Sequence, residues 1–235
     1  MNFQIIEQGR STLLVAPELV DHINPSWFDL NWWRSRGVTI TSAPGRGESY
    51  FLHYRELALN LVWRHYKRGG LVAKISEDNY LWTGLQQTRA YQEFVLTAEL
   101  RDRGLPVPRP LAAQVIREGL VYRADFVTER LPEVKSMADR LTSKLHEFPW
   151  SEVGKTIARF HRQGLDHVDL NVRNILLNSN NRVYLIDFDR CRLRQPQQEW
   201  QQGNLDRLLR SLQKLFPHQN HDSHWQRLLD GYNQN

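Results

Sequence analysis

The sequence predicts an α+β fold in two lobes: a small antiparallel sheet lobe with one main helix, residues 1–131, and a reduced, mostly helical lobe, residues 132–235. Three observations predict this division. Short aromatic and β-branched runs broken by glycine fill the first third of the chain, an amphipathic helical pattern follows them, and helical periodicity dominates after Leu131-Pro132. With 235 residues, 40% of them hydrophobic, the chain can bury a core as one unit or two small lobes.

The elements of the first lobe follow from local patterns. A helix is expected over Thr88 to Arg103, because apolar side chains recur at about helical spacing and Gly104 follows the last turn. The LPVPRP segment, residues 105–110, must be extended because proline cannot continue a helix. The expected strands are Ser11 to Ala16, Ser49 to Tyr54, Leu57 to Tyr66, Ala112 to Arg117 and Leu120 to Thr128.

The second lobe is predicted to be helical apart from two short strands. Helices are expected over Ser136 to Phe148 and over Ser151 to Gln163, the latter opening with Ser151 as its N-cap. The strands are Ile175 to Leu177 and Val183 to Ile186. A further helix carries leucines at helical spacing between residues 205 and 215, an apolar stripe expected to face the core.

The composition suggests an anionic partner. There are 31 basic and 26 acidic residues, a net charge of +5, and 25 of the basic residues are arginine, whose planar fork suits phosphate and carboxylate. A merely solvated arginine-rich surface is an equally good explanation of the charge alone. No recognition motif or long basic tract is present, so nucleic acid is not the expected partner.

The compartment is predicted from what the sequence lacks. A single cysteine, Cys191, excludes an internal disulfide framework and agrees with a reducing environment. The hydrophobic runs are too short for a signal peptide or a membrane-spanning helix. We therefore expect the protein in the cytoplasm.

The strongest functional signal is HVDLNVRNILL, residues 167–177, followed by VYLIDFD, residues 183–189. Phosphoryl transfer needs a carboxylate that accepts the proton of the attacking hydroxyl and oxygen ligands that hold metal ions against the triphosphate. Asp169, Asn174 and Asp187 supply these groups, at spacings of 5 and 13 residues. The arrangement resembles the protein-kinase set H-R-D-L-x-x-x-N followed by D-F-G. By that resemblance Asp169 is the catalytic base, and Asn174 and Asp187 bind Mg²⁺.

Departures from the protein-kinase pattern point to a different acceptor. Asp189 replaces the glycine of D-F-G, Asn171 stands in place of the usual lysine, and no A-P-E sequence follows. Only 48 of the 235 residues come after Asp187, too few for a large substrate lobe. We expect a small or lipid-linked hydroxyl as acceptor. Asn171 is expected to orient or neutralise the transferring phosphate, and Asp189 either adds an oxygen ligand or faces solvent.

Candidate phosphate-binding residues lie upstream. Gly45, Arg46 and Gly47 precede a strand and could close over phosphates through backbone N–H groups, although an ordinary turn would read the same. The basic residue that pairs with the α- and β-phosphates is Arg64 or Lys74, and its carboxylate partner is Glu93 on the following helix. Lys74 lies 19 residues before Glu93, and Arg64 lies 29 before it.

Seven motifs in order extend the resemblance beyond kinases in general. The chain resembles the Kdo kinases, which phosphorylate 3-deoxy-D-manno-octulosonic acid (Kdo) in lipopolysaccharide, over roughly residues 40–215. The motifs are GRG, VWRHYKRGGLVAK, TRAYQEF, LPVPRPLAA, YRADFVTERL, HVDLNVRNILL and LIDFDRCRLR.

The resemblance carries specific implications. It favours Arg64 over Lys74 as the phosphate-pairing residue, and it implies ATP and Mg²⁺ as cosubstrate and metal. It also implies transfer of the γ-phosphoryl group to the 4-hydroxyl of Kdo on a lipid A precursor. The resemblance further implies that the enzyme acts as a peripheral protein at the cytoplasmic face of the bacterial inner membrane. Two alternatives remain open from the residues: a kinase for another sugar or small-molecule hydroxyl, and a non-catalytic nucleotide-binding scaffold.

Two side features have competing interpretations. The segment WFDLNWWRSRG, residues 27–37, is either an interfacial aromatic and cationic segment on an anionic membrane or an amphipathic helix packed on the small lobe, which we favour. His218, His221 and His224 lie three residues apart, and a polar loop is favoured over a metal site.

Overall fold

The computed structural model divides into two compact units, each of which is described separately. The first unit contains residues 1–99 and 108–130, and the second contains residues 100–107 and 131–235. The border between them therefore falls inside one helix as well as after Arg130. A division into functional lobes at residue 131 stays a prediction. The structure describes residues 2–43, 49–67, 78–143 and 148–234.

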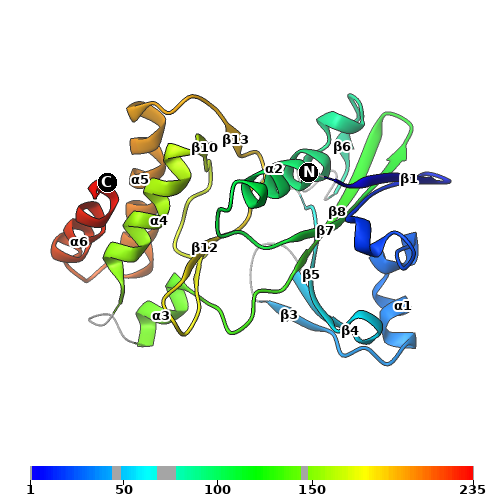
Figure 1. Cartoon of the computed structure of the whole chain (residues 1–235), viewed down its shortest axis with the longest axis horizontal. Helices are drawn as coiled ribbons and strands as arrows, with labels where there is room; N and C mark the ends of the chain where they lie inside the picture. Colours follow the sequence, from blue (N-terminus) through cyan, green and yellow to red (C-terminus); the bar gives the residue numbers. More distant parts are fainter. Residues whose placement is uncertain (1, 44–48, 68–77, 144–147, 235) are drawn as a thin grey trace. The chain divides into compact units, whose positions relative to one another are not determined.

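The first unit is built on an antiparallel sheet with the order β1-β2-β7-β8-β5-β4-β3, and β6 pairs with β8 beside this path (Figure 1). Short β-branched and aromatic runs form these strands, as their composition predicts. The strands are β1 (Gln4–Gln8), β2 (Ser11–Val15), β3 (Thr41–Ala43), β4 (Ser49–Tyr54), β5 (Leu59–His65), β6 (Tyr80–Leu81), β7 (Pro110–Glu118) and β8 (Val121–Glu129).

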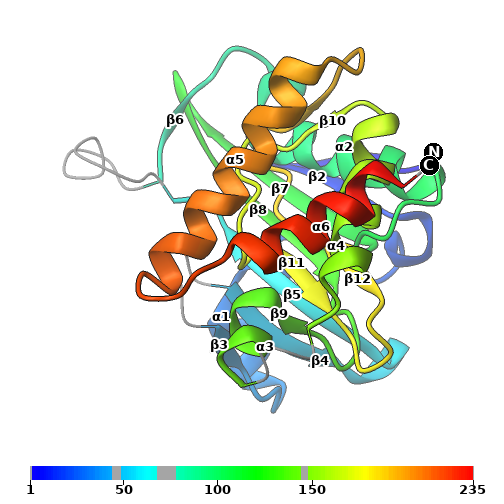
Figure 2. The ribbon, with the colours of Figure 1, turned by 90° about the vertical axis from the view of Figure 1, so that its left-hand side faces the viewer.

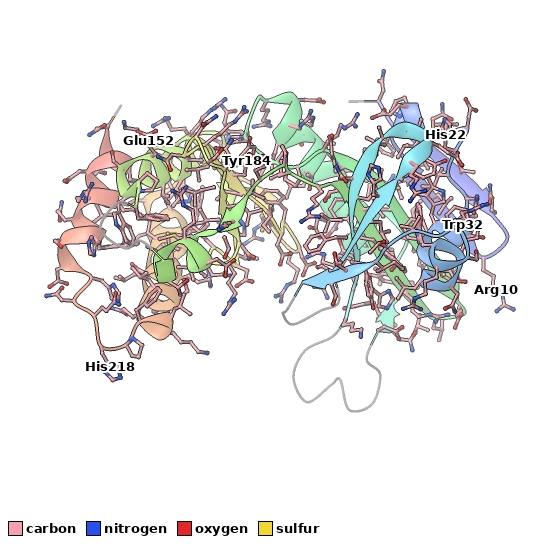
Figure 3. All side chains as sticks on the ribbon, turned by 90° about the horizontal axis from the view of Figure 1, so that it is seen from below. Arg10, His22, Trp32, Glu152, Tyr184 and His218 are labelled. Carbon is pink, nitrogen blue, oxygen red and sulfur yellow. The ribbon has the colours of Figure 1, made fainter. Side chains whose placement is uncertain are left out.

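Aromatic side chains before β3 cover one part of this sheet. Helix α1 (Leu30–Ser35) places Trp33 in an edge-to-face contact with Trp27, and both indoles are 1% exposed. Trp33 also contacts Tyr54 of β4, and the nearby His22 and Trp32 are labelled in Figure 3. The interpretation as a packed helix is therefore confirmed for these indoles, which are unavailable to a membrane surface.

Helix α2 (Arg89–Asp102) lies between β6 and β7 in the chain and begins after a Thr88 hydroxyl that caps it. Its apolar residues Ala90 and Phe94 are buried against Phe126 of β8 and neighbouring side chains. The last turn of α2 belongs to the second unit. A sheet with helices packed on it confirms the predicted α+β class.

The second unit is mostly helical and contains short antiparallel strand pairs. β11 pairs with β12 and with β9, and β10 pairs with β13. Leu205, Leu208 and Leu212 of the predicted apolar stripe are buried, which confirms its assignment to the core. The elements are β9 (Lys135–Ser136), α3 (Met137–Ser143), α4 (Trp150–Arg162), β10 (Leu165–Asp166), β11 (Ile175–Leu177), β12 (Val183–Leu185), β13 (Arg192–Leu193), α5 (Gln198–Leu215) and α6 (Asp222–Asn233).

Helices α4 and α6 lie side by side (Figure 2), and they approach each other at two glycines. A Cβ atom added to Gly154 of α4 would lie 2.0 Å from the carbonyl oxygen of Leu228, and one added to Gly231 of α6 would lie 2.2 Å from that of Ser151. No side chain fits at either distance, so the two helix backbones are in direct contact.

Three predicted boundaries are wrong for local reasons. Ser151 is not an N-cap: α4 starts one residue earlier, at the buried Trp150, with Pro149 as its N-cap residue. The helix expected from Ser136 begins only at Met137, because Ser136 pairs with Leu176 in a sheet. The strand expected from Leu57 begins at Leu59, because residues 55–57 form a 3₁₀ turn that ends at a left-handed residue 58.

No helix among the described residues is long and apolar enough to cross a membrane.

Candidate active site

The loop between β10 and β11 presents the predicted base. Asp169 is exposed, whereas Asn174, five residues later, is buried. Asn174 Nδ2 donates to the backbone oxygen of Asp169 at 3.0 Å and lies 3.5 Å from its carboxylate atom Oδ2. The amide of Asn174 therefore holds the backbone of Asp169 in place, while the carboxylate remains open to solvent.

The β11–β12 hairpin brings Asp187 back to this loop. The turn at Asn178–Asn181 reverses the chain, and β12 then pairs with β11. The N–H of Ile186 donates to the backbone oxygen of Asn174 at 3.1 Å, so Asp187 begins next to Asn174. Asp187 has φ = 65°, a left-handed conformation that is unfavourable for a residue with a side chain. The loop and the hairpin bring together the three residues that the spacing singled out.

A buried hydrogen-bond network fixes the base of the loop. Asn204 of α5 is 3% exposed; its Oδ1 accepts from the N–H of His167 at 2.8 Å, and its Nδ2 donates to Asp166 Oδ1 at 3.0 Å. His167 Nε2 lies 3.1 Å from the backbone oxygen of Ile186, which ties the loop to the residue before Asp187. Burial lowers the pKa of His167, which favours the neutral imidazole.

Asp166 is the charged centre of this network. Its carboxylate is 7% exposed and accepts a hydrogen bond from Arg194 at 3.1 Å in addition to that from Asn204. A buried carboxylate needs such partners, because an unpaired charge is costly to desolvate. Asp166, Arg194 and Asn204 are not among the residues that the sequence predicts for the site. A buried asparagine on the leucine-rich face of a predicted helix was the available signal.

Asn171 braces the loop. Its Nδ2 donates to the backbone oxygen of Asp169 at 2.9 Å, and its Oδ1 accepts from the N–H of Arg173 at 2.9 Å. Both ends of the amide are thus used within the loop. Its expected contact with the transferring phosphate stays a prediction.

In the first unit, Arg64 forms an ion pair with Glu93. Arg64 lies near the end of β5, and its guanidinium contacts Glu93 Oε2 on α2. Glu93 is 3% exposed, and Tyr66 donates a second hydrogen bond, 2.5 Å long, to the same oxygen. The Arg64 guanidinium also lies 4.9 Å from the centre of the Tyr66 ring. Of the two candidate basic residues, Arg64 therefore contacts Glu93, and Lys74 lies outside the described residues.

Other predicted residues are placed as follows. Gly45, Arg46 and Gly47 lie outside the described residues. His218 is exposed at the turn between α5 and α6 (Figure 3), while His221 is buried with its Nε2 2.9 Å from the backbone oxygen of Phe216. Among the described residues, no cluster of three or more His, Cys, Asp or Glu side chains is arranged to hold a metal ion.

The fold resembles that of a solved structure. "WaaP in complex with acyl carrier protein" matches with a TM-score of 0.60 and 14% sequence identity, over 94% of this chain and 88% of that chain. At this sequence identity the likeness shows the fold alone.

The sequence comparisons give the family. The profile of the lipopolysaccharide kinase (Kdo/WaaP) family matches residues 30–232. The chain is 47% identical to a 3-deoxy-D-manno-octulosonic acid kinase of Stenotrophomonas maltophilia, over 88% of this chain and 82% of that protein. It is 41% identical to the protein of the same name from Vibrio parahaemolyticus, over 84% and 82%. The chain belongs to the lipopolysaccharide kinase (Kdo/WaaP) family and is a kinase of lipopolysaccharide core biosynthesis.

Proposed function

We propose that the protein transfers the γ-phosphoryl group of ATP to the 4-hydroxyl of a Kdo residue on a lipid A precursor. The observation that carries this proposal is 47% identity, over 88% of the chain, to a relative named for its action on this sugar. The exposed carboxylate of Asp169, held by Asn174, supports it because a sugar hydroxyl can reach that group.

Asp169 is the proposed catalytic base. In phosphoryl transfer, the protein mainly positions the two reactants and neutralises charge. Asp169 would accept the proton of the attacking hydroxyl and hold its oxygen in line with the γ-phosphorus. The hydrogen bonds from Asn174 and Asn171 to the Asp169 backbone oxygen fix the position of the backbone that carries the carboxylate. This rigidity matters because small misplacements at a reacting atom lower the rate strongly.

Asn174 and Asp187 are the proposed ligands of Mg²⁺. Magnesium is usually bound by one or two protein oxygens together with substrate phosphates, so a larger acidic cluster is not required. Nδ2 of Asn174 is directed at Asp169, which leaves Oδ1 as the amide atom that a metal ion would meet. Asp187 supplies the carboxylate beside it. The donor set therefore fits Mg²⁺, which would neutralise phosphate charge.

Arg64 is the proposed phosphate-pairing residue. A guanidinium can bind two phosphate oxygens at once, and the ion pair with buried Glu93 fixes its direction. Gly45, Arg46 and Gly47 stay predicted contacts to the nucleotide, and Lys74 stays the alternative to Arg64.

A lipid-linked acceptor leads us to propose peripheral action at the cytoplasmic face of the inner membrane. Sedimentation with vesicles containing the Kdo-bearing lipid A precursor would measure this. We expect a larger bound fraction than with vesicles of neutral phospholipid, and equal binding to both would contradict the proposed location.

The function is tested by incubating the purified protein with ATP, Mg²⁺ and the Kdo-bearing lipid A precursor and locating the added phosphate by mass spectrometry and NMR. We expect phosphate at the 4-hydroxyl, and a loss of at least about a thousandfold in rate for Asp169→Ala. Asp206→Ala is a matched control, because Asp206 contacts only Gln202 among the hydrogen bonds found on α5. Transfer to a water-soluble alcohol but not to this lipid would instead support a kinase for another hydroxyl.

A further inference from the structure

The segment that follows Asp187 carries three arginines at alternate positions, Arg190, Arg192 and Arg194. Their surroundings differ. The side chain of Arg194 is 38% exposed and donates to Asp166, whereas those of Arg190 and Arg192 are 75% and 66% exposed. The proposed catalytic roles use none of the three.

This segment lies against the catalytic loop within the second unit. In the β10–β13 ladder Arg192 pairs with Asp166, and Asp166 lies three residues before Asp169 in the chain. Between the two exposed arginines, Cys191 Sγ lies 3.7 Å from His167 Nδ1. Arg190 and Arg192 therefore flank a residue in contact with the base of the loop that presents Asp169.

The backbone at Arg190 is unfavourable for arginine. The N–H of Cys191 donates to the backbone oxygen of Phe188 at 3.0 Å and closes a turn in which Arg190 is the third residue, with φ = 59°. Glycine or asparagine suits this position, because a larger side chain is strained in the left-handed region. Asp187, three residues earlier, has the same kind of conformation. Stability of the turn therefore does not explain arginine here, and strain of this kind is characteristic of functional segments.

Local ion pairs do not account for the two guanidinium groups either. Arg190 Nε lies 3.6 Å from Asp189, and Arg192 Nε lies 3.7 Å from Asp166, both longer than a charge-assisted hydrogen bond. Asp166 is already satisfied by Arg194 and Asn204. Pairs of such length between largely exposed guanidinium groups and nearby carboxylates contribute little to stability.

We propose that Arg190 and Arg192 bind an oxyanion of the acceptor beside the catalytic loop, either the carboxylate of the sugar acid or a phosphate of its lipid. This inference rests on the proposed function. A guanidinium binds either oxyanion through two parallel hydrogen bonds. Such binding would hold the acceptor while its hydroxyl meets Asp169, and would offset the repulsion of an anionic acceptor by the three nearby aspartates, Asp169, Asp187 and Asp189.

The test measures acceptor affinity by calorimetry without ATP, using the Kdo-bearing lipid A precursor, its carboxyl methyl ester and a form without lipid phosphates. Wild type is expected to bind the complete acceptor about tenfold more tightly than one of the two altered acceptors. Arg190→Gly and Arg192→Gln should each reduce that ratio at least threefold. Arg227→Gln, which removes the same charge from an exposed position on α6, should keep it.

If the affinity ratio falls for the methyl ester, the arginines bind the carboxylate; if it falls for the form without lipid phosphates, they bind a phosphate. Two further readouts separate binding from a structural role: the KM for ATP should not change, and the thermal midpoint of Arg190→Gly should equal or exceed that of wild type, because glycine relieves the turn. Unchanged ratios in both arginine variants, or no discrimination by wild type, would overturn the inference. Binding without phosphate transfer would contradict the proposed function alone.

Discussion

Replacing Asn204 with alanine tests whether the catalytic loop is held from α5. The variant removes the acceptor of the buried N–H of His167 and one donor to the buried carboxylate of Asp166. The buried N–H of His167, left without an acceptor, costs about 1–3 kcal/mol, and Asp166, which keeps Arg194, loses one hydrogen bond worth about 1 kcal/mol, so the free energy of unfolding should fall by about 2–4 kcal/mol. This is less than the total stability of about 5–15 kcal/mol typical of domains, and the variant should still fold.

Two measurements check this prediction. Urea unfolding gives the stability change, and phosphate transfer by the folded variant should show a kcat at least tenfold lower with a nearly unchanged KM for ATP, because the base is displaced while nucleotide contacts remain. Gln202→Ala is the matched control, since Gln202 lies on the exposed part of α5. A loss under about 0.5 kcal/mol in Asn204→Ala, with normal kcat, would refute the reasoning.

A second variant at position 204 should make the loss of stability depend on pH. Asn204→Asp keeps an acceptor for the His167 N–H but places a second carboxylate next to Asp166, 3.0 Å from the present amide nitrogen. Two buried carboxylates repel each other, so the pair holds a proton and its pKa is raised in the folded state. The stabilisation due to that proton is present at low pH and disappears as pH rises. The stability deficit of the variant should therefore be smaller at pH 5 than at pH 7.

Three other perturbations follow from buried contacts. Tyr66→Phe removes one of the donors to Glu93 and should lower kcat/KM for ATP several-fold without changing the KM for the acceptor; equal effects on both substrates would contradict this. Gly154→Ala, whose Cβ meets an α6 carbonyl at 2.0 Å, should cost about 1–3 kcal/mol in thermal or urea unfolding, whereas Gly203→Ala, which meets nothing within 4 Å on α5, should stabilise by about 0.5–1 kcal/mol. Burial lowers the pKa of His161 from 6.5 to about 4, so the unfolded chain takes up its proton at a higher pH than the folded protein. The free energy of unfolding should therefore fall by about 3 kcal/mol as the pH is lowered from 6.5 to 4. Unfolding of His161→Leu should lack that slope, and an unchanged slope would exclude this origin.

The geometry of the loop that carries Asp169 could be predicted because its information is local. The spacing of Asp169, Asn174 and Asp187 requires only a strand, a turn and a returning strand, and the β11–β12 hairpin realises it. The contact between Arg64 and Glu93 was similarly accessible, because a strand and the helix after it commonly pack together.

The support beneath the loop could not be predicted, because it joins distant positions. Asn204 lies 37 residues beyond His167, and although helical spacing places it on the leucine face of α5, no local pattern specifies which group it contacts there. Short strands such as β10 and β13 are two residues long and exist only through pairing with each other. The wrong N-cap at Ser151 has the same origin, since burial of Trp150 decides where the helix begins.

The position of β2 has a consequence for how fast the first unit can form. This strand lies between β1 and β7, and its residues Leu13, Leu14 and Val15 are fully buried. Its partner β7 is about a hundred positions away, since Ser11 pairs with Ile116. Closing a loop of that length is an entropic cost met before the contacts form, so the central sheet should assemble slowly relative to its hairpins. During synthesis, the apolar β2 must wait for most of the first unit to leave the ribosome, and it is exposed to aggregation in that interval.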